Sequence, residues 1–132
     1  MAGVRIHTIS IDVDNMQQAL RFWRDFLKLP VRAVAPASDP FTGMTPPSDA
    51  NVTKAVLGIG ERIIELNAMP RASAVTLMIE VDDLEATTIP AAVTQGILPP
   101  APLVLSFPKL KVVNVPSHMT GGVTVGLCEH NP

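Results

Sequence analysis

An internal repeat constrains this chain more than any other feature. Residues 9–16 (I-S-I-D-V-D-N-M) align with residues 77–84 (L-M-I-E-V-D-D-L), an offset of 68. Residues 60–66 (G-E-R-I-I-E-L) align with residues 121–127 (G-G-V-T-V-G-L), an offset of 61, so loops must absorb a seven-residue difference. A repeat of this size indicates gene duplication into two similar modules, because neither half can bury its sheet alone.

The repeat predicts a β-α-β-β-β order in each module, and hydrophobic periodicity locates most of the segments. Residues 5–13 alternate, with Ile9, Ile11 and Val13 on one face, which is typical of a strand. Asn15 is a candidate helix cap, and its helix should end before Pro30. The other predicted segments are a Pro-rich surface loop at 36–49, strands at 53–58, 61–67 and 75–81, a weaker helix at 82–96, and strands at 103–107, 110–115 and 122–127. We therefore expect an α+β fold in a single domain over residues 1–132, with module one at 4–68 and module two at 73–129.

Composition excludes several classes of partner. The 132 residues are 47% hydrophobic and 17% charged, with a formal net charge of −2. The chain is long enough for a core without disulfides, and the single Cys128 cannot form an internal one, which favours a reducing compartment. The sequence has no basic patch for nucleic acid and no apolar run near the roughly 18 residues of a membrane span. We expect a cytoplasmic protein with neither nucleic-acid nor membrane partners.

Two runs carry a resemblance to a known family. Residues 13–30 read V-D-N-M-Q-Q-A-L-R-F-W-R-D-F-L-K-L-P, and residues 116–129 read P-S-H-M-T-G-G-V-T-V-G-L-C-E. The first resembles the opening module of the vicinal oxygen chelate superfamily, and the second resembles its closing module, with some methylmalonyl-CoA epimerase-like character. The resemblance implies the glyoxalase/bleomycin resistance fold, in which two β-α-β-β-β modules form a curved mixed sheet around a concave site. It also implies a homodimer.

The resemblance further implies where metal-dependent members hold a divalent ion. Four ligands, usually His, Gln or Glu, come from the first and last strands of each module. In this chain those positions fall on Thr8, Thr76, Glu65 and Gly126. Hydroxyls are poor ligands and glycine has no side chain, so we expect no metal and no other cofactor. A divalent metal is expected only if His7, which lies one residue from the ligand position, converges with Glu65 and His118.

Glu65 is the candidate catalytic base. A carboxylate in an apolar concavity suits proton transfer near neutral pH, because desolvation favours its protonated form. The alternative is that Glu65 lies at a wetter rim or pairs with a cation such as Arg62 or Lys111. His118, in the loop before the last strand, is the candidate second proton-transfer group, although a histidine on a solvated turn is the plainer interpretation.

Eight residues are expected to contact a substrate: Thr8, Ser10, Ile63, Thr76, Met78, Thr124, Gly126 and Phe41. The hydroxyls of Thr8, Ser10 and Thr76 can bind a carbonyl oxygen, although threonine is common in strands for other reasons. Met78 can line an apolar pocket or fill a gap in the core. Phe41 can close over a ligand or lie at a dimer contact.

Three functions fit these residues, each acting on a small apolar or carbonyl-containing molecule. The first is a metal-independent isomerase, epimerase or cyclase, in which Glu65 removes a proton next to a carbonyl while Thr8 and Thr76 donate to the oxyanion. The second is a non-catalytic protein that sequesters a drug or metabolite. The third, which the aligned positions favour least, is a metal-dependent lyase or dioxygenase using His7, Glu65 and His118.

Overall fold

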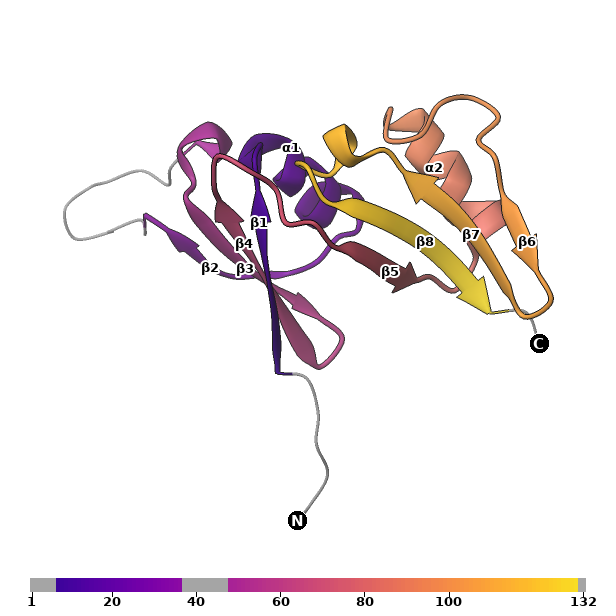
Figure 1. The fold of residues 1–132 in the computed structure, drawn as a ribbon, viewed down its shortest axis with the longest axis horizontal. Coiled ribbons are helices and arrows are strands. Elements are labelled where there is room, and N and C mark those ends of the chain that lie inside the picture. The colour runs from indigo at the N-terminus through magenta and orange to yellow at the C-terminus, as the bar shows by residue number, and fades with distance from the viewer. Residues whose placement is uncertain (1–6, 37–47, 131–132) are drawn as a thin grey trace, which may run out of the picture.

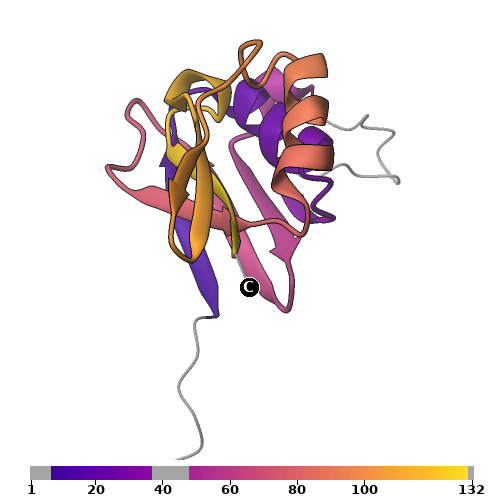
Figure 2. The ribbon, with the colours of Figure 1, turned by 90° about the vertical axis from the view of Figure 1, so that its right-hand side faces the viewer.

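Two four-stranded mixed sheets form the framework, with helices over the same side of both (Figures 1 and 2). The computed structural model describes residues 7–36 and 48–130. The first sheet, in the order β1-β4-β3-β2, contains β1 (Thr8–Val13), β2 (Val31–Ala35), β3 (Lys54–Ile59) and β4 (Arg62–Ala68). The second, in the order β5-β8-β7-β6, contains β5 (Thr76–Glu80), β6 (Leu105–Phe107), β7 (Leu110–Val115) and β8 (Thr124–His130). The predicted α+β class and the β-α-β-β-β order of both modules are confirmed.

Strand register reproduces the sequence repeat. In module one β1 runs parallel to β4, with Ser10 opposite Glu65. In module two β5 runs parallel to β8, with Met78 opposite Gly126. These pairs are related by the offsets of 68 and 61 that align the two halves of the sequence. Ser10 and Met78 are therefore structurally equivalent positions, as are Glu65 and Gly126.

The helix of module one starts as predicted and then widens. Asn15 Oδ1 accepts a hydrogen bond from the Gln18 amide at 3.1 Å, which caps α1 (Met16–Leu20). The helix continues as the π-helical segment η1 (Arg21–Phe26), whose wider turn is closed by the Leu27 amide donating to Phe22 O at 2.9 Å.

The helix of module two has the same two parts in the reverse order. The π-helical segment η3 (Leu84–Thr88) is capped by Asp83, and α2 (Ile89–Thr94) follows it. Pro90 is the second residue of α2, but because η3 runs directly into α2 it lies within a continuous helix and cannot donate a hydrogen bond to the preceding turn. Gly96, with φ of +74°, follows the helix end as predicted. Two short 3₁₀ turns complete the elements, η2 (Asp49–Asn51) and η4 (Ser117–Met119).

The core lies between the helices and one face of each sheet. Phe22 and Trp23 are fully buried there in edge-to-face contact, with ring centroids 5.1 Å apart. Both modules contribute to this one hydrophobic cluster, which includes Ile11, Val13, Leu57, Ile64, Leu66, Leu84, Val113, Val125 and Leu127. Because strand side chains alternate, the remaining face of each sheet points away from the helices. We call these the open faces of module one and module two.

Backbone contacts join the modules at the start of α1. The carbonyl of Gly121, in the turn before β8, accepts hydrogen bonds from the amides of Asp14 at 2.8 Å and Asn15 at 3.3 Å. Gly121 has φ of +90°, and a Cβ at this position would lie 2.6 Å from Ala19 Cβ. Only glycine allows this close approach. None of the described helices is both long enough and apolar enough to cross a bilayer.

One strand was missed by the sequence-based prediction, and the end of another differs from it. Strand β2 was not predicted, because it is a short segment between Pro30 and Pro36 whose pairing with β3 is interrupted by a register shift. Strand β8 continues to His130, three residues beyond the predicted end at 127, because His130 pairs with Leu110 of β7. Most of the predicted loop at 36–49 lies outside the described residues.

Candidate functional site

The open face of module one carries the polar candidates in three rows across the sheet. The middle row is Ser10, Glu65, Val56 and Ala33, and its flanking rows are Asp12, Asn67, Lys54 and Ala35 on one side and Thr8, Ile63 and Gly58 on the other. The structure therefore brings Thr8, Ser10, Ile63 and Glu65 together. Ser10, not Thr8, lies directly opposite Glu65.

Glu65 lies in a hydrogen-bonded polar cluster. Its Oε1 accepts from Ser10 Oγ at 3.3 Å and lies 3.5 Å from Lys54 Nζ. Asn67 Nδ2 in turn donates to Ser10 Oγ at 2.9 Å. The Glu65 side chain is 26% exposed, so it is open to a ligand. We call Ser10, Lys54, Glu65 and Asn67 the Glu65 cluster.

The cluster corrects the apolar setting expected of Glu65 and agrees with the alternative in which Glu65 pairs with a cation. Its surroundings on this sheet are polar and not apolar, because hydroxyl, amide and ammonium groups flank the carboxylate. Its cation is Lys54, whereas Lys111 pairs with Glu85 at 2.5 Å and Arg62 donates to Glu61 O at 3.2 Å. The hairpin could have revealed Lys54, because a two-residue turn at 60–61 places residue 54 opposite residue 67.

The residues at the implied ligand positions do not fit a tight divalent-metal site. Glu65 contributes one carboxylate, but an ammonium lies beside it. Thr8 Oγ1 is hydrogen-bonded to His7 Nδ1 at 2.5 Å. At Gly126 a Cβ would lie 2.7 Å from Met78 Sδ, so a thioether occupies the space where a ligating side chain would begin. One carboxylate and two threonine hydroxyls form a poor donor set for a borderline divalent ion.

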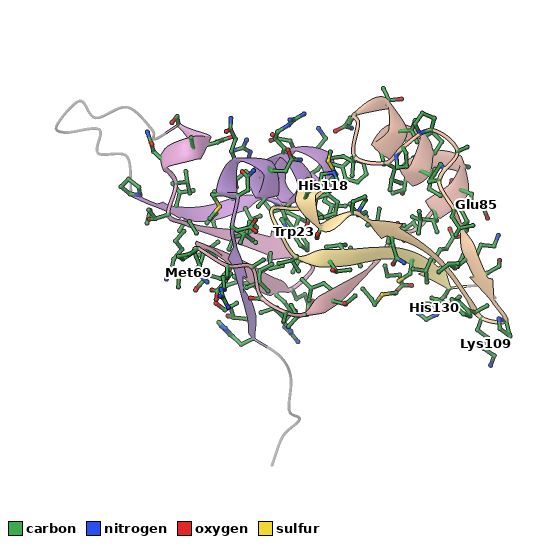
Figure 3. The ribbon with its side chains drawn as sticks, turned by 45° about the horizontal axis from the view of Figure 1, so that its top comes forward. Trp23, Met69, Glu85, Lys109, His118 and His130 are labelled. Carbon is green, nitrogen blue, oxygen red and sulfur yellow. The ribbon has the colours of Figure 1, made fainter. Side chains whose placement is uncertain are left out.

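His118 lies away from the Glu65 cluster, which corrects its expected place at the mouth of the site. It is exposed in η4, beside the turn that follows α2, and lines a cavity of about 300 Å³ together with Ile97, Leu98 and Pro99. Figure 3 shows it on the helix side of the sheets. In residues 7–36 and 48–130 no three His, Cys, Asp or Glu side chains form a group suited to an ion, so His7, Glu65 and His118 do not converge.

The open face of module two has an apolar patch around Met78, Val112 and Cys128, with polar side chains such as Glu80, Asn114 and His130 beside it. Met78, 49% exposed, packs over Gly126, while Thr76 and Thr124 lie opposite each other at one end. Val112 and Cys128 are buried on this face, although neither belongs to the helix-side core. Burial raises the pKa of the Cys128 thiol, and the nearby Glu80 adds to the effect.

The candidates thus form two groups on different sheets. Met78 also reaches a cavity of about 320 Å³ between the modules, lined by Leu27, Leu29, Ile59 and residues 78–81. That cavity includes none of the Glu65 cluster. Phe41, the expected lid residue, lies outside the described residues.

Comparison with known proteins supports the fold. No family model and no curated protein matches the sequence. A glyoxalase family protein from Enterococcus faecalis is 20% identical with a TM-score of 0.63, over 99% of this chain and 100% of that one. A lactoylglutathione lyase from Agrobacterium tumefaciens is 16% identical with a TM-score of 0.64, over 96% and 94%. A glyoxalase/bleomycin resistance protein/dioxygenase from Nocardioides is 12% identical with a TM-score of 0.62, over 98% and 85%.

These structures confirm the fold that the sequence motifs implied. The structural neighbours are described as glyoxalase, bleomycin resistance or dioxygenase family proteins. At such identities the likeness concerns the fold alone, and function has to be argued from the residues of the site.

Proposed function

We propose that this glyoxalase-type chain binds a small carbonyl compound on the open face of module one and that Glu65 moves a proton on it without a metal. The observation that carries the proposal is the Glu65 cluster, in which a partly exposed carboxylate is contacted at Oε1 by a hydroxyl and by an ammonium group. The reaction class is isomerisation, epimerisation or cyclisation by proton abstraction next to the carbonyl.

Glu65 has an oxygen left for proton transfer. Both contacts that the described residues make with the carboxylate go to Oε1. Oε2 therefore accepts no hydrogen bond from those residues and can take a proton from a ligand carbon. The Ser10 hydroxyl accepts a hydrogen bond from Asn67 Nδ2 and donates one to Glu65. These contacts restrict the rotation of the carboxylate and so orient the base.

Lys54 can supply the charge that the product of this step requires. When a proton moves from the ligand carbon to Glu65, the carboxylate becomes neutral and the ligand becomes an enolate. The Lys54 ammonium then loses its anionic partner and can pair with the enolate oxygen. Return of the proton from Glu65 after the enolate has turned over gives an epimer, and return to the γ-carbon of a conjugated enolate gives an isomer; either step regenerates the Glu65 carboxylate.

Proton exchange tests the proposal without knowledge of the natural substrate. We would follow pyruvate, 2-oxobutanoate, levulinate and cyclohexanone by ¹H NMR in D₂O with the wild type, Glu65→Gln and the matched surface variant Glu61→Gln. We expect exchange faster than in buffer for the wild type and Glu61→Gln, and the buffer rate for Glu65→Gln. Equal exchange with Glu65→Gln, or no protein-dependent exchange of any probe, would contradict proton transfer.

A sequestering function is the second candidate, and the apolar patch on the open face of module two favours it. Exposed Met78 and Leu105 flank the buried Val112 there, so an apolar ligand would gain contact area without any reaction. Probe binding that shifts amide resonances on β5 and β8, with no exchange, supports this candidate over catalysis.

We also propose that the chain forms a homodimer in the cytoplasm. Leu103, Leu105 and Phe107 are exposed along the β6 edge of module two, and apolar groups of this kind are commonly covered by a partner. Light scattering after gel filtration should give twice the 14.1 kDa chain mass. Leu103→Ser should shift the mass toward the monomer.

A further inference from the structure

Arg32 occupies an irregular position in β2. Val31 lies opposite Leu57 and Ala33 opposite Val56, so two steps along β2 match one step along β3. Arg32 is the extra residue of this β-bulge. Bulges release one residue from the regular alternation of the strand and redirect its side chain.

The redirected side chain lies on the open face of module one. A Cβ at Gly58 would be 2.9 Å from Arg32 Nε and 3.1 Å from Nη2. Gly58 pairs with Ile63, which shares its face of β4 with Glu65. The guanidinium therefore lies against the bare backbone of β3, on the same face as the Glu65 cluster. A side chain at position 58 would displace it.

The charge of Arg32 is not neutralised by any described residue. Arg24 binds Asp49 and Asp25, Lys111 pairs with Glu85, and Lys54 pairs with Glu65, whereas Arg32 makes no ion pair within residues 7–36 and 48–130. Among the described residues no carboxylate binds its guanidinium, and a guanidinium can bind two carboxylate oxygens at once.

We propose that Arg32 binds the carboxylate of the ligand whose carbonyl portion lies at Glu65, so that the ligand class is that of carbonyl-bearing organic acids. The proposal rests on the proposed function, because it uses the same face and the same base. Ile63 and Glu65 are two residues apart on β4, roughly 7 Å along the strand. That spacing suits a short acid such as a 4-oxo acid, with the carboxylate at one end and the acidic carbon several bonds away.

Paired probes isolate the carboxylate. We would titrate ¹⁵N-labelled protein with levulinate and with methyl levulinate, which keeps the carbon skeleton and lacks the charge. The variants are Arg32→Met, Arg32→Lys and the matched control Arg62→Met, whose side chain lies on the other face of β4. We expect the wild type and Arg62→Met to bind levulinate at least about tenfold more tightly than the ester. Arg32→Met should lose this preference, and Arg32→Lys should keep only part of it.

Gly58→Ala gives a second, independent test with Arg32 still present. The new methyl group should move the guanidinium from its place on β3 and reduce the preference for levulinate, while circular dichroism confirms that the fold is unchanged. The proposal is overturned if the wild type does not prefer levulinate, or if Arg32→Met or Gly58→Ala keeps the full preference.

The two proposals fail in distinguishable ways. If levulinate binding depends on Arg32 but Glu65→Gln leaves exchange unchanged, the carboxylate site stands and the proton-transfer function is wrong. If Glu65→Gln abolishes exchange while Arg32→Met binds levulinate normally, the function stands and the ligand class proposed here is wrong.

Discussion

The sulfur of Met78 fills the space that a side chain on Gly126 would need, since a Cβ there would lie 2.7 Å from it. The equivalent pair in module one is Ser10 and Glu65, joined by a hydrogen bond of 3.3 Å. One duplicated pair is thus a hydroxyl and a carboxylate, and the other is a thioether over a bare backbone. The two open faces have diverged at the same position, one toward polar chemistry and one toward apolar contact.

This packing predicts coupling between positions 78 and 126. Gly126→Ala should lower the free energy of unfolding by about 1 kcal/mol, because the thioether must move and Val112 also lies close. In a Met78→Ala background Gly126→Ala should lower the free energy of unfolding by clearly less, because the thioether is already gone. Urea unfolding of the two single variants and the double variant measures the coupling. Additive effects would show that the Met78 side chain does not restrict this site.

Lys54→Met should reduce catalysis much more than stability. Lys54 is about half exposed, and surface ion pairs contribute at most about 1 kcal/mol, so the melting temperature should change little. Exchange of the carbonyl probes should slow markedly, because no cation remains to pair with the enolate. Lys54→Arg, which keeps the charge, should restore part of the rate. Unchanged exchange in Lys54→Met would remove Lys54 from the mechanism.

The ion pair between Arg24 and Asp49 predicts a pH-dependent contribution to stability. Arg24 Nη1 and Nη2 bind the two Asp49 oxygens at 2.9 and 2.8 Å, and this contact holds the pKa of Asp49 below its usual 3.8. A lowered carboxyl pKa stabilises the folded state above the unfolded value and loses that effect as the pH falls through the folded value. Asp49→Asn should therefore lower the free energy of unfolding by about 1 kcal/mol at pH 7 and by progressively less below pH 3.8.

Urea titrations of the wild type and Asp49→Asn at pH 7 and near pH 3 provide the measurement, with Glu61→Gln as a surface control. A difference that is the same at both pH values would contradict the charge-based explanation. Because Arg24 belongs to η1 and Asp49 to η2, the loss of this pair should also loosen the packing between these two segments.

Cys128 should react slowly with thiol reagents. It is only 6% exposed, and burial raises its pKa above the ordinary 9.0, so the reactive thiolate is scarce at neutral pH. Iodoacetamide should label the native protein far more slowly than the urea-unfolded protein. Because the unfolded chain ionises first, native stability should also fall as the pH rises above 9.0. Rapid stoichiometric labelling of the native protein at pH 7 would contradict this placement.

The periodic part of the sequence predicted the framework well. The repeat predicted two equivalent modules, and the structure pairs Ser10 with Glu65 and Met78 with Gly126 at equivalent positions of those modules. The sequence-based assignment places Thr8, not Ser10, beside Glu65, because a period-two pattern gives the face of a strand but not its register against a neighbour. Asn15 and Gly96 marked the predicted helix ends through local capping chemistry. Strand β2 had no such signal, since its bulge at Arg32 breaks the alternation by which strands are recognised.

The partners of the candidate residues depended on tertiary geometry. Lys54 reaches Glu65 across a hairpin whose turn residues set the register, and placing that turn one or two residues earlier hides the contact. Arg32 reaches the open face only because position 58 is glycine. His118 follows the path of the loop after β7, which no periodic pattern encodes, and so lies beside Ile97 on the helix side.

The contact of Gly121 with the first turn of α1 has a consequence for the history of the fold. One module closes the helix end of the other through Gly121 O, so the cap of the first half is completed by residues from the last strand turn of the second. The two copies are therefore no longer equivalent, because module two completes the helix start of module one. Either half expressed alone would leave the amides or the carbonyl of this joint without their partners, whereas a substitution on an open face leaves the joint intact.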